Sequence, residues 1–157
     1  MMAWKRLGKC LLLAFSLGIL CVPVGGNEDF SPNVTVELSK VKPLWLHVTV
    51  QCRAKTRVTF YKYQLPWGNY NSMEFVAVTP NEHFIERVWP VDDPSPEKIS
   101  MEPNETRSGD INLQMKFIGL DSAIKKSSVR LFWAYNAPKE LNISEWPGGL
   151  IFIPQQK

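Results

Sequence analysis

Histidine and cysteine are scarce in this chain, which has 2 histidines and 3 cysteines among 157 residues. The zinc-protease pattern HExxH, which sets two histidines on one helix face, is absent. His47 and His83 lie far apart, so we expect no metal site and no cofactor. A copper site from Cys52, His47 and Met73 is disfavoured, because alternation along a strand directs Cys52 and His47 to opposite faces.

Long apolar runs are also missing, except near the start of the chain. Three basic residues precede an apolar run over residues 10–22, and Gly26 ends a small-residue stretch. This order predicts a secretory signal peptide over residues 1–26, cleaved after about Gly26. The run is shorter than the ~20 residues of a membrane-spanning helix, so we expect no stable membrane span after cleavage. Lipid attachment at Cys21 is disfavoured, because Leu20 stands where a small residue is needed.

An excess of charge is missing from the predicted mature chain. The whole sequence has 18 lysine and arginine residues against 15 aspartate and glutamate residues. Lys5, Arg6 and Lys9 all lie in the signal peptide, which leaves 15 basic against 15 acidic residues. A nucleic-acid partner is therefore not expected, since it needs a basic surface. The location that we predict is secreted or periplasmic.

A disulfide framework is missing for the same reason. Cys10 and Cys21 belong to the signal peptide, and Cys52 is left without a partner in the chain. We interpret Cys52 as a buried core residue, with an intermolecular disulfide as the alternative. Residues 27–157 are enough for one domain held by an ordinary apolar core.

Long helical patterns are absent, and alternation with a period of two dominates instead. In residues 44–52 the apolar positions fall on one face, and residues 111–117 and 129–135 repeat the pattern. The weaker strand candidates are residues 34–38, 57–63, 73–79, 84–91 and 150–153. Residues 119–126 have the spacing of a helical turn. Short strands between frequent turns predict an all-β fold, an immunoglobulin-like antiparallel β-sandwich of about seven to eight strands.

Aromatic residues supply the candidate binding surface. Trp67 and Tyr70 lie in a Gly/Asn loop, and Trp146 precedes Pro147 and two glycines. Exposed aromatic rings at the end of a sandwich bind sugar rings or apolar partner surfaces, so these three are the predicted ligand-binding residues. The alternative is that they close the ends of the core, as the alternation predicts for Trp133.

Two further patterns have weaker meaning. Asp92, Asp93 and Glu97 make an acidic loop, but the spacing of a calcium loop is missing and aspartates before proline are typical of turns. Three N-glycosylation triplets occur, which matter only in a eukaryotic secretory pathway. They begin at Asn33, Asn104 and Asn142.

Two segments carry a resemblance to known proteins. Residues 59–67, TFYKYQLPW, and residues 99–106, in which Asn104 replaces a glycine, resemble turn-and-strand motifs of an exported immunoglobulin-like domain. That domain precedes the catalytic domain in deuterolysin-type peptidyl-Lys metalloendopeptidases. Residues 65–68, 92–94 and 131–135 are similar to small stand-alone secreted bacterial proteins of unknown function. The resemblance implies a β-sandwich, and it carries over no catalytic residue because the zinc helix is absent.

These observations predict a non-catalytic exported binding or accessory module, whose partner is an unknown protein or a glycan. No catalytic residue is predicted. One alternative is a modulator or inhibitor of an extracellular protease, in which the loop over residues 66–72 occupies a cleft. The other alternative is an enzyme of unfamiliar type, which needs titratable groups that converge in a pocket.

Overall fold

The computed structural model describes residues 28–29, 33–69, 71–89, 93, 95–143 and 147–156. The predicted signal peptide lies outside these residues. The chain forms strands with few helices, so the all-β prediction is confirmed. The strands are β1 (Glu28–Asp29), β2 (Val34–Leu38), β3 (Trp45–Gln51), β4 (Val58–Tyr61), β5 (Met73–Val78), β6 (Lys98–Met101), β7 (Thr106–Asn112), β8 (Val129–Tyr135) and β9 (Gly148–Ile153). The helices are η1 (Lys62–Gln64), η2 (Leu113–Met115), α1 (Leu120–Lys126) and η3 (Lys139–Leu141).

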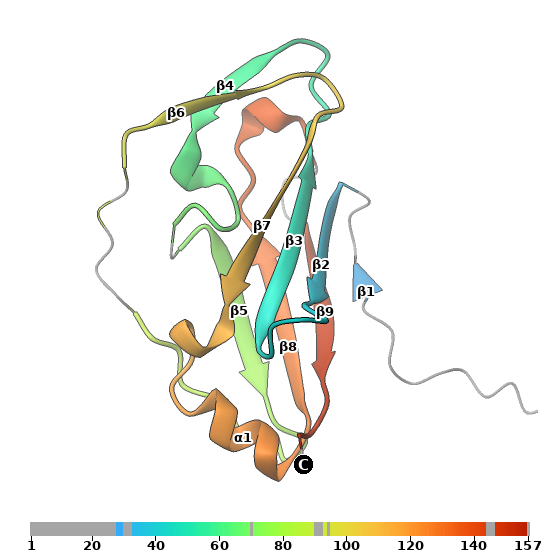
Figure 1. Cartoon of the computed structure of the whole chain (residues 1–157), viewed down its shortest axis with the longest axis vertical. Helices are drawn as coiled ribbons and strands as arrows, with labels where there is room; N and C mark the ends of the chain where they lie inside the picture. Colours follow the sequence, from blue (N-terminus) through green and yellow to red (C-terminus); the bar gives the residue numbers. More distant parts are fainter. Residues whose placement is uncertain are drawn as a thin grey trace, which may run out of the picture.

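The strands form antiparallel sheets arranged in two main layers (Figure 1). The front sheet has the order β2-β3-β7, and the back sheet has the order β1-β9-β8-β5. The end sheet pairs β4 with β6 at one end of the molecule, and α1 lies at the opposite end. This is a sandwich of two packed layers, as the strand pattern predicts; the immunoglobulin-like connectivity stays a prediction.

Alternating side chains of the two main sheets fill the space between the layers. In β3 the even-numbered residues from Leu46 to Val50 are fully buried, and Leu44 and Cys52 continue that face on either side. In β8 the odd-numbered residues from Val129 to Tyr135 are buried in the same way. The burial of Cys52 and Trp133 follows directly from this period of two.

The sequence pattern is wrong over residues 113–117. Strand β7 ends at Asn112, whose side chain accepts a hydrogen bond from the Gln114 amide at 2.9 Å. This contact caps η2, so Leu113 is buried while Met115 is 63% exposed. An asparagine cap outweighs apolar alternation here, because it satisfies an amide that a strand end leaves free.

Residues 84–89 also differ from the predicted strand. Their ladder contacts in the described part are two isolated bridges, Val78 to Phe84 and Arg87 to Phe117. The segment therefore crosses from the edge of the back sheet to the residues after η2, rather than extending either sheet. Asn104 has φ of 62°, which explains an asparagine where the resembling motif has glycine.

Candidate functional site

Trp67 is the predicted ligand-binding residue that the structure describes; Tyr70 and Trp146 lie outside the described residues. Its half-buried indole packs against the core and lies flat over Gly109 in β7. A methyl group on Gly109 would meet the indole closer than van der Waals contact permits. Trp67 therefore fills a space between the sheets that the missing side chain of Gly109 leaves open.

Short hydrogen bonds fix the loop that carries Trp67. The Asn69 side chain accepts a hydrogen bond from the Asn71 amide at 2.7 Å. The Ser72 hydroxyl lies 2.6 Å from the Pro66 carbonyl oxygen and 2.8 Å from that of Asn69. Gly68 is needed because any side chain would collide with the Lys62 carbonyl oxygen. The described residues on either side of position 70 are thus held in a turn, and the protease-modulator alternative stays a prediction.

A second set of contacts joins this loop to the back sheet. The fully buried Tyr135 donates its hydroxyl to the Gln64 carbonyl oxygen at 2.8 Å. The Gln64 side chain accepts a hydrogen bond from the Tyr61 amide at 2.9 Å. Burial raises the pKa of the Tyr135 phenol, so the group stays protonated and keeps its role as donor. The backbone beneath the loop is thus fixed before any ligand arrives.

Beside the loop lies a hollow of about 260 Å³, which we call the amide hollow. Among the described residues, its lining combines carboxamides, the Ser72 hydroxyl and one tyrosine, without a carboxylate or an ammonium group. The lining residues are Tyr63, Gln64, Asn69, Asn71, Ser72 and Asn136. The ring of Tyr63 stacks on Tyr61, with centroids 5.2 Å apart, so its orientation is fixed from outside the hollow.

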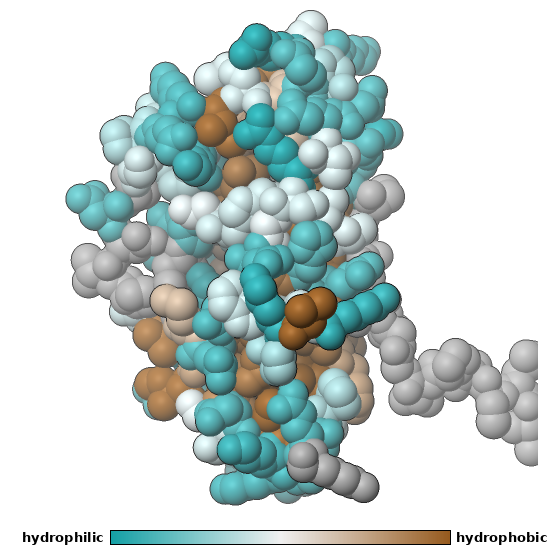
Figure 2. Space-filling model, in the orientation of Figure 1, coloured by the Kyte–Doolittle hydropathy of each residue, from teal (hydrophilic) through white to brown (hydrophobic). Residues whose placement is uncertain are grey.

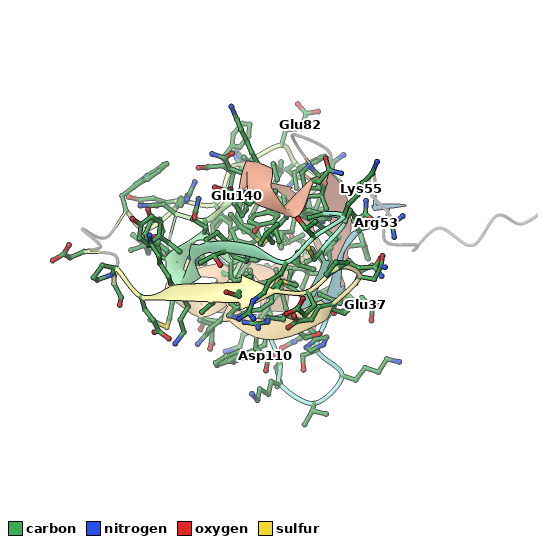
Figure 3. All side chains as sticks on the ribbon, turned by 90° about the horizontal axis from the view of Figure 1, so that it is seen from above. Glu37, Arg53, Lys55, Glu82, Asp110 and Glu140 are labelled. Carbon is green, nitrogen blue, oxygen red and sulfur yellow. The ribbon has the colours of Figure 1, made fainter. Side chains whose placement is uncertain are left out.

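A larger hollow of about 450 Å³ lies on the outer face of the front sheet, and we call it the charged hollow. The register sets Glu37 and Asp110 on either side of His47. His47 Nδ1 donates to Asp110 at 2.9 Å, and Lys42 Nζ reaches the other oxygen of Asp110 at 3.1 Å. Figure 3 shows Glu37 and Asp110 on the same side of the molecule, with the loop between β2 and β3 projecting beyond them.

The electrostatics of the charged hollow favour an ionised Asp110. Hydrogen bonds from His47 and then Lys42 lower the pKa of this carboxyl group. The Lys42 ammonium also lies 4.7 Å from the ring centroid of Trp45, so the cation is shared between the two partners. On the same face, the hydroxyls of Thr49 and Ser108 bond to each other at 2.9 Å. The Ser39 hydroxyl, which lines the hollow, accepts hydrogen bonds from the amides of Val41 and Lys42.

Sequence reasoning missed both hollows. Their residues come from segments far apart in the chain: Tyr63 and Asn136 in one, Glu37 and Asp110 in the other. No local pattern joins such residues; only the sheet register does. The sequence did predict that Glu37, His47 and Asp110 face outward on three strands. It did not predict that these three strands pair with one another.

The remaining candidates lie at the surface. In the described residues no cluster of three or more metal-ligating side chains occurs. His83 is exposed. Of the acidic loop, Glu97 pairs with Lys62 at 2.8 Å, and Asp92 lies outside the described residues. Of the glycosylation triplets, Asn104 and Asn142 are exposed, and Asn33 is half-buried beside β2.

Comparisons with protein families, curated proteins and solved structures find no match for this chain. The resemblance to the domain that precedes deuterolysin-type proteases therefore stays a prediction. Over the residues that the structure describes, no helix is long and apolar enough to span a membrane.

Proposed function

We propose that this protein is an exported, non-catalytic binding module, and that the amide hollow takes one ring of a neutral glycan. The observation that carries the proposal is the uncharged lining of this hollow: carboxamides and a hydroxyl beside a tyrosine ring. A carboxamide offers both a donor and an acceptor, which is the pairing that sugar hydroxyls require. An ionic ligand finds no counter-charge among the lining residues.

The size of the amide hollow limits the ligand. Ligand pockets usually hold ~300–1,000 Å³, whereas this one holds about 260 Å³. A single sugar ring at a chain end fits a hollow of this volume, and a large apolar ligand does not. The Tyr63 ring supplies an aromatic surface for the C–H face of the sugar.

The fixed loop supports the same proposal. Ordering a flexible loop on binding costs about 0.5–1.5 kcal/mol for each immobilised side chain. Here the hydrogen bonds of Asn69 and Ser72, and that of Tyr135 to Gln64, already order the backbone. Much of this cost is thus met during folding.

We also propose that the sandwich has immunoglobulin-like connectivity, which suits a binding role. Strand β3 pairs with β7 in one layer, and β8 pairs with both β5 and β9 in the other. These pairings support a correspondence of β3 and β7 to strands B and E, and of β5, β8 and β9 to strands C, F and G, of an immunoglobulin sandwich. Binding loops in such sandwiches lie at the ends of the sheets.

A glycan array followed by titration with the best neutral oligosaccharide tests the proposal. We expect binding that Asn136→Asp weakens at least about tenfold, because a carboxylate removes the amide donor and adds a desolvation cost. Asn81→Asp makes the same change in an exposed turn away from the hollow, and it should bind like the wild type. No binding of neutral glycans up to about 1 mM, or equal loss in both variants, would refute the proposal.

A second candidate is an enzyme of unfamiliar type at the charged hollow. It is favoured by one observation, the contact of 2.9 Å between His47 and Asp110. This contact orients an imidazole as in general-base catalysis. A panel of ester, glycoside and peptide substrates decides the question: turnover that is lost in His47→Gln would establish catalysis, and no turnover would exclude this site for those classes.

A further inference from the structure

The outer face of the back sheet carries apolar side chains at its middle, where a solvated sheet face is normally polar. Val76 on β5 is 46% exposed, Phe132 on β8 is 43% exposed, and Phe152 on β9 is 44% exposed. Leu150 lies half-buried among them. Val76, Phe132 and Leu150 are cross-strand partners, so they form one continuous row across β5, β8 and β9, which we call the apolar row. The row ends at β1, where Glu28 is the cross-strand partner of Leu150.

The front sheet of the same chain shows the contrast. Its outward positions carry mostly polar residues, Glu37, His47, Thr49, Ser108 and Asp110, with the half-buried Trp45 at the start of β3. Figure 2, which views that side, shows mostly hydrophilic colours over the upper part of the molecule. A sheet with one solvated face has polar residues on that face, as the front sheet does. The apolar row therefore indicates a surface that another molecule covers.

The residues on either side of the apolar row differ in size. On one side of the apolar row, two residues along each strand from Phe132 and Leu150, Arg130 is paired with Phe152. Two positions in the other direction, Ala134 is paired with Gly148 on β9 and with Glu74 on β5. The face thus has a bulky, basic end and a small, acidic end at equal distances from the row.

This arrangement is complementary to itself. Rotation by 180° about an axis along the apolar row places a second copy face to face with the first. The basic end of one copy then lies over the acidic end of the other. Phe152 of one copy then lies over Gly148 of the other, and Arg130 lies over Ala134 beside Glu74. The Glu74 side chain is 56% exposed and pairs with Arg87 through one oxygen, which leaves its other oxygen for Arg130. Isologous dimers require such self-complementarity.

We propose that a second copy of this chain docks on the outer face of the back sheet, with the apolar row on the two-fold axis. Strands of six or seven residues at ~3.4 Å each make the face about 20 Å long, and three strands make it about 15 Å wide. That area is well below the ~800 Å² per partner of a stable interface. The dimer is accordingly weak and dependent on concentration.

Sedimentation velocity of the purified protein from about 1 to 500 µM tests the proposal. The weight-average sedimentation coefficient should rise with concentration. Phe132→Asp places a charge on the axis twice in each dimer, and it should raise the dissociation constant at least about tenfold. Ile118→Asp is the matched control, because Ile118 is 56% exposed on another part of the surface; this variant should dimerise like the wild type.

A cross-link tests the geometry itself. Leu150 lies on the proposed axis, so Leu150→Cys brings two thiols together, and a short bis-maleimide should join two chains. The cross-link uses residues 27–157, the predicted mature chain, which lack Cys10 and Cys21. Ile118→Cys should not be joined, and the native Cys52 does not interfere because it is fully buried. A monomer at every concentration, or equal loss of dimer in Phe132→Asp and Ile118→Asp, would overturn the proposal.

Discussion

The contact between Trp67 and Gly109 gives the sharpest test of how this sandwich is packed. In Gly109→Ala the new methyl group overlaps the indole, so Trp67 must leave its place between the sheets. Overpacking of this kind costs about 1–3 kcal/mol. The backbone itself tolerates alanine, since Gly109 lies in the middle of β7 and is not among the residues with positive φ.

Gly109→Ala should stabilise the protein instead of destabilising it when the Trp67 indole is absent. Trp67→Ala alone costs about 2 kcal/mol, roughly half the value for a fully buried aromatic residue. In that background Gly109→Ala finds open space, and alanine is better than glycine inside a strand by about 0.5–1 kcal/mol. The coupling energy of the pair is then about 2 kcal/mol or more.

Urea unfolding, followed by far-ultraviolet circular dichroism, measures the free energy of unfolding of the wild type, the two single variants and the double variant. Equal m-values indicate the same extent of unfolding in all four proteins. If Gly109→Ala destabilises both backgrounds alike, the packing argument is wrong. If Trp67→Ala leaves stability unchanged but abolishes ligand binding, the indole serves recognition rather than the core. The cycle thus decides between the two interpretations of Trp67 that the sequence left open.

Two further predictions concern titration. Burial raises the pKa of Tyr135, so the contribution of this phenol to stability is full below about pH 10, the pKa of an unfolded tyrosine, and is lost as pH rises above that value. Absorbance at about 295 nm should therefore show the Tyr135 phenolate only on unfolding. Tyr135→Phe should cost about 1 kcal/mol of stability through the lost hydrogen bond to Gln64. The sequence has four tyrosines, so the phenolate of Tyr135 is the difference in absorbance between the wild type and Tyr135→Phe; such a difference while the far-ultraviolet spectrum is still native would contradict this. Because hydrogen bonds from His47 and Lys42 lower the pKa of Asp110, its contribution is present above about pH 4 and is lost as pH falls through the folded value. Asp110→Asn should flatten the acid side of the stability profile slightly, since the carboxylate is about one third exposed, and an unchanged profile would count against the contact.

The sequence by itself determined the strands whose two faces differ. The alternation over residues 44–52 and 129–135 predicted β3 and β8 and their buried sides, because a period of two is a local property of extended backbone. Short polar contacts overrode the same kind of pattern elsewhere. Asn112 caps η2 and ends β7, and residues 84–89 cross between layers instead of joining a sheet.

Only the tertiary structure decided which residues come together in the candidate sites. The hollows join Tyr63 to Asn136 and Glu37 to Asp110, and the apolar row joins Val76, Phe132 and Leu150. Strand alternation tells which side of its own strand a residue occupies, but not which strand lies beside it. Register is set by the packing of whole sheets and by the turns between strands, so residues far apart in sequence become neighbours only when the layers close.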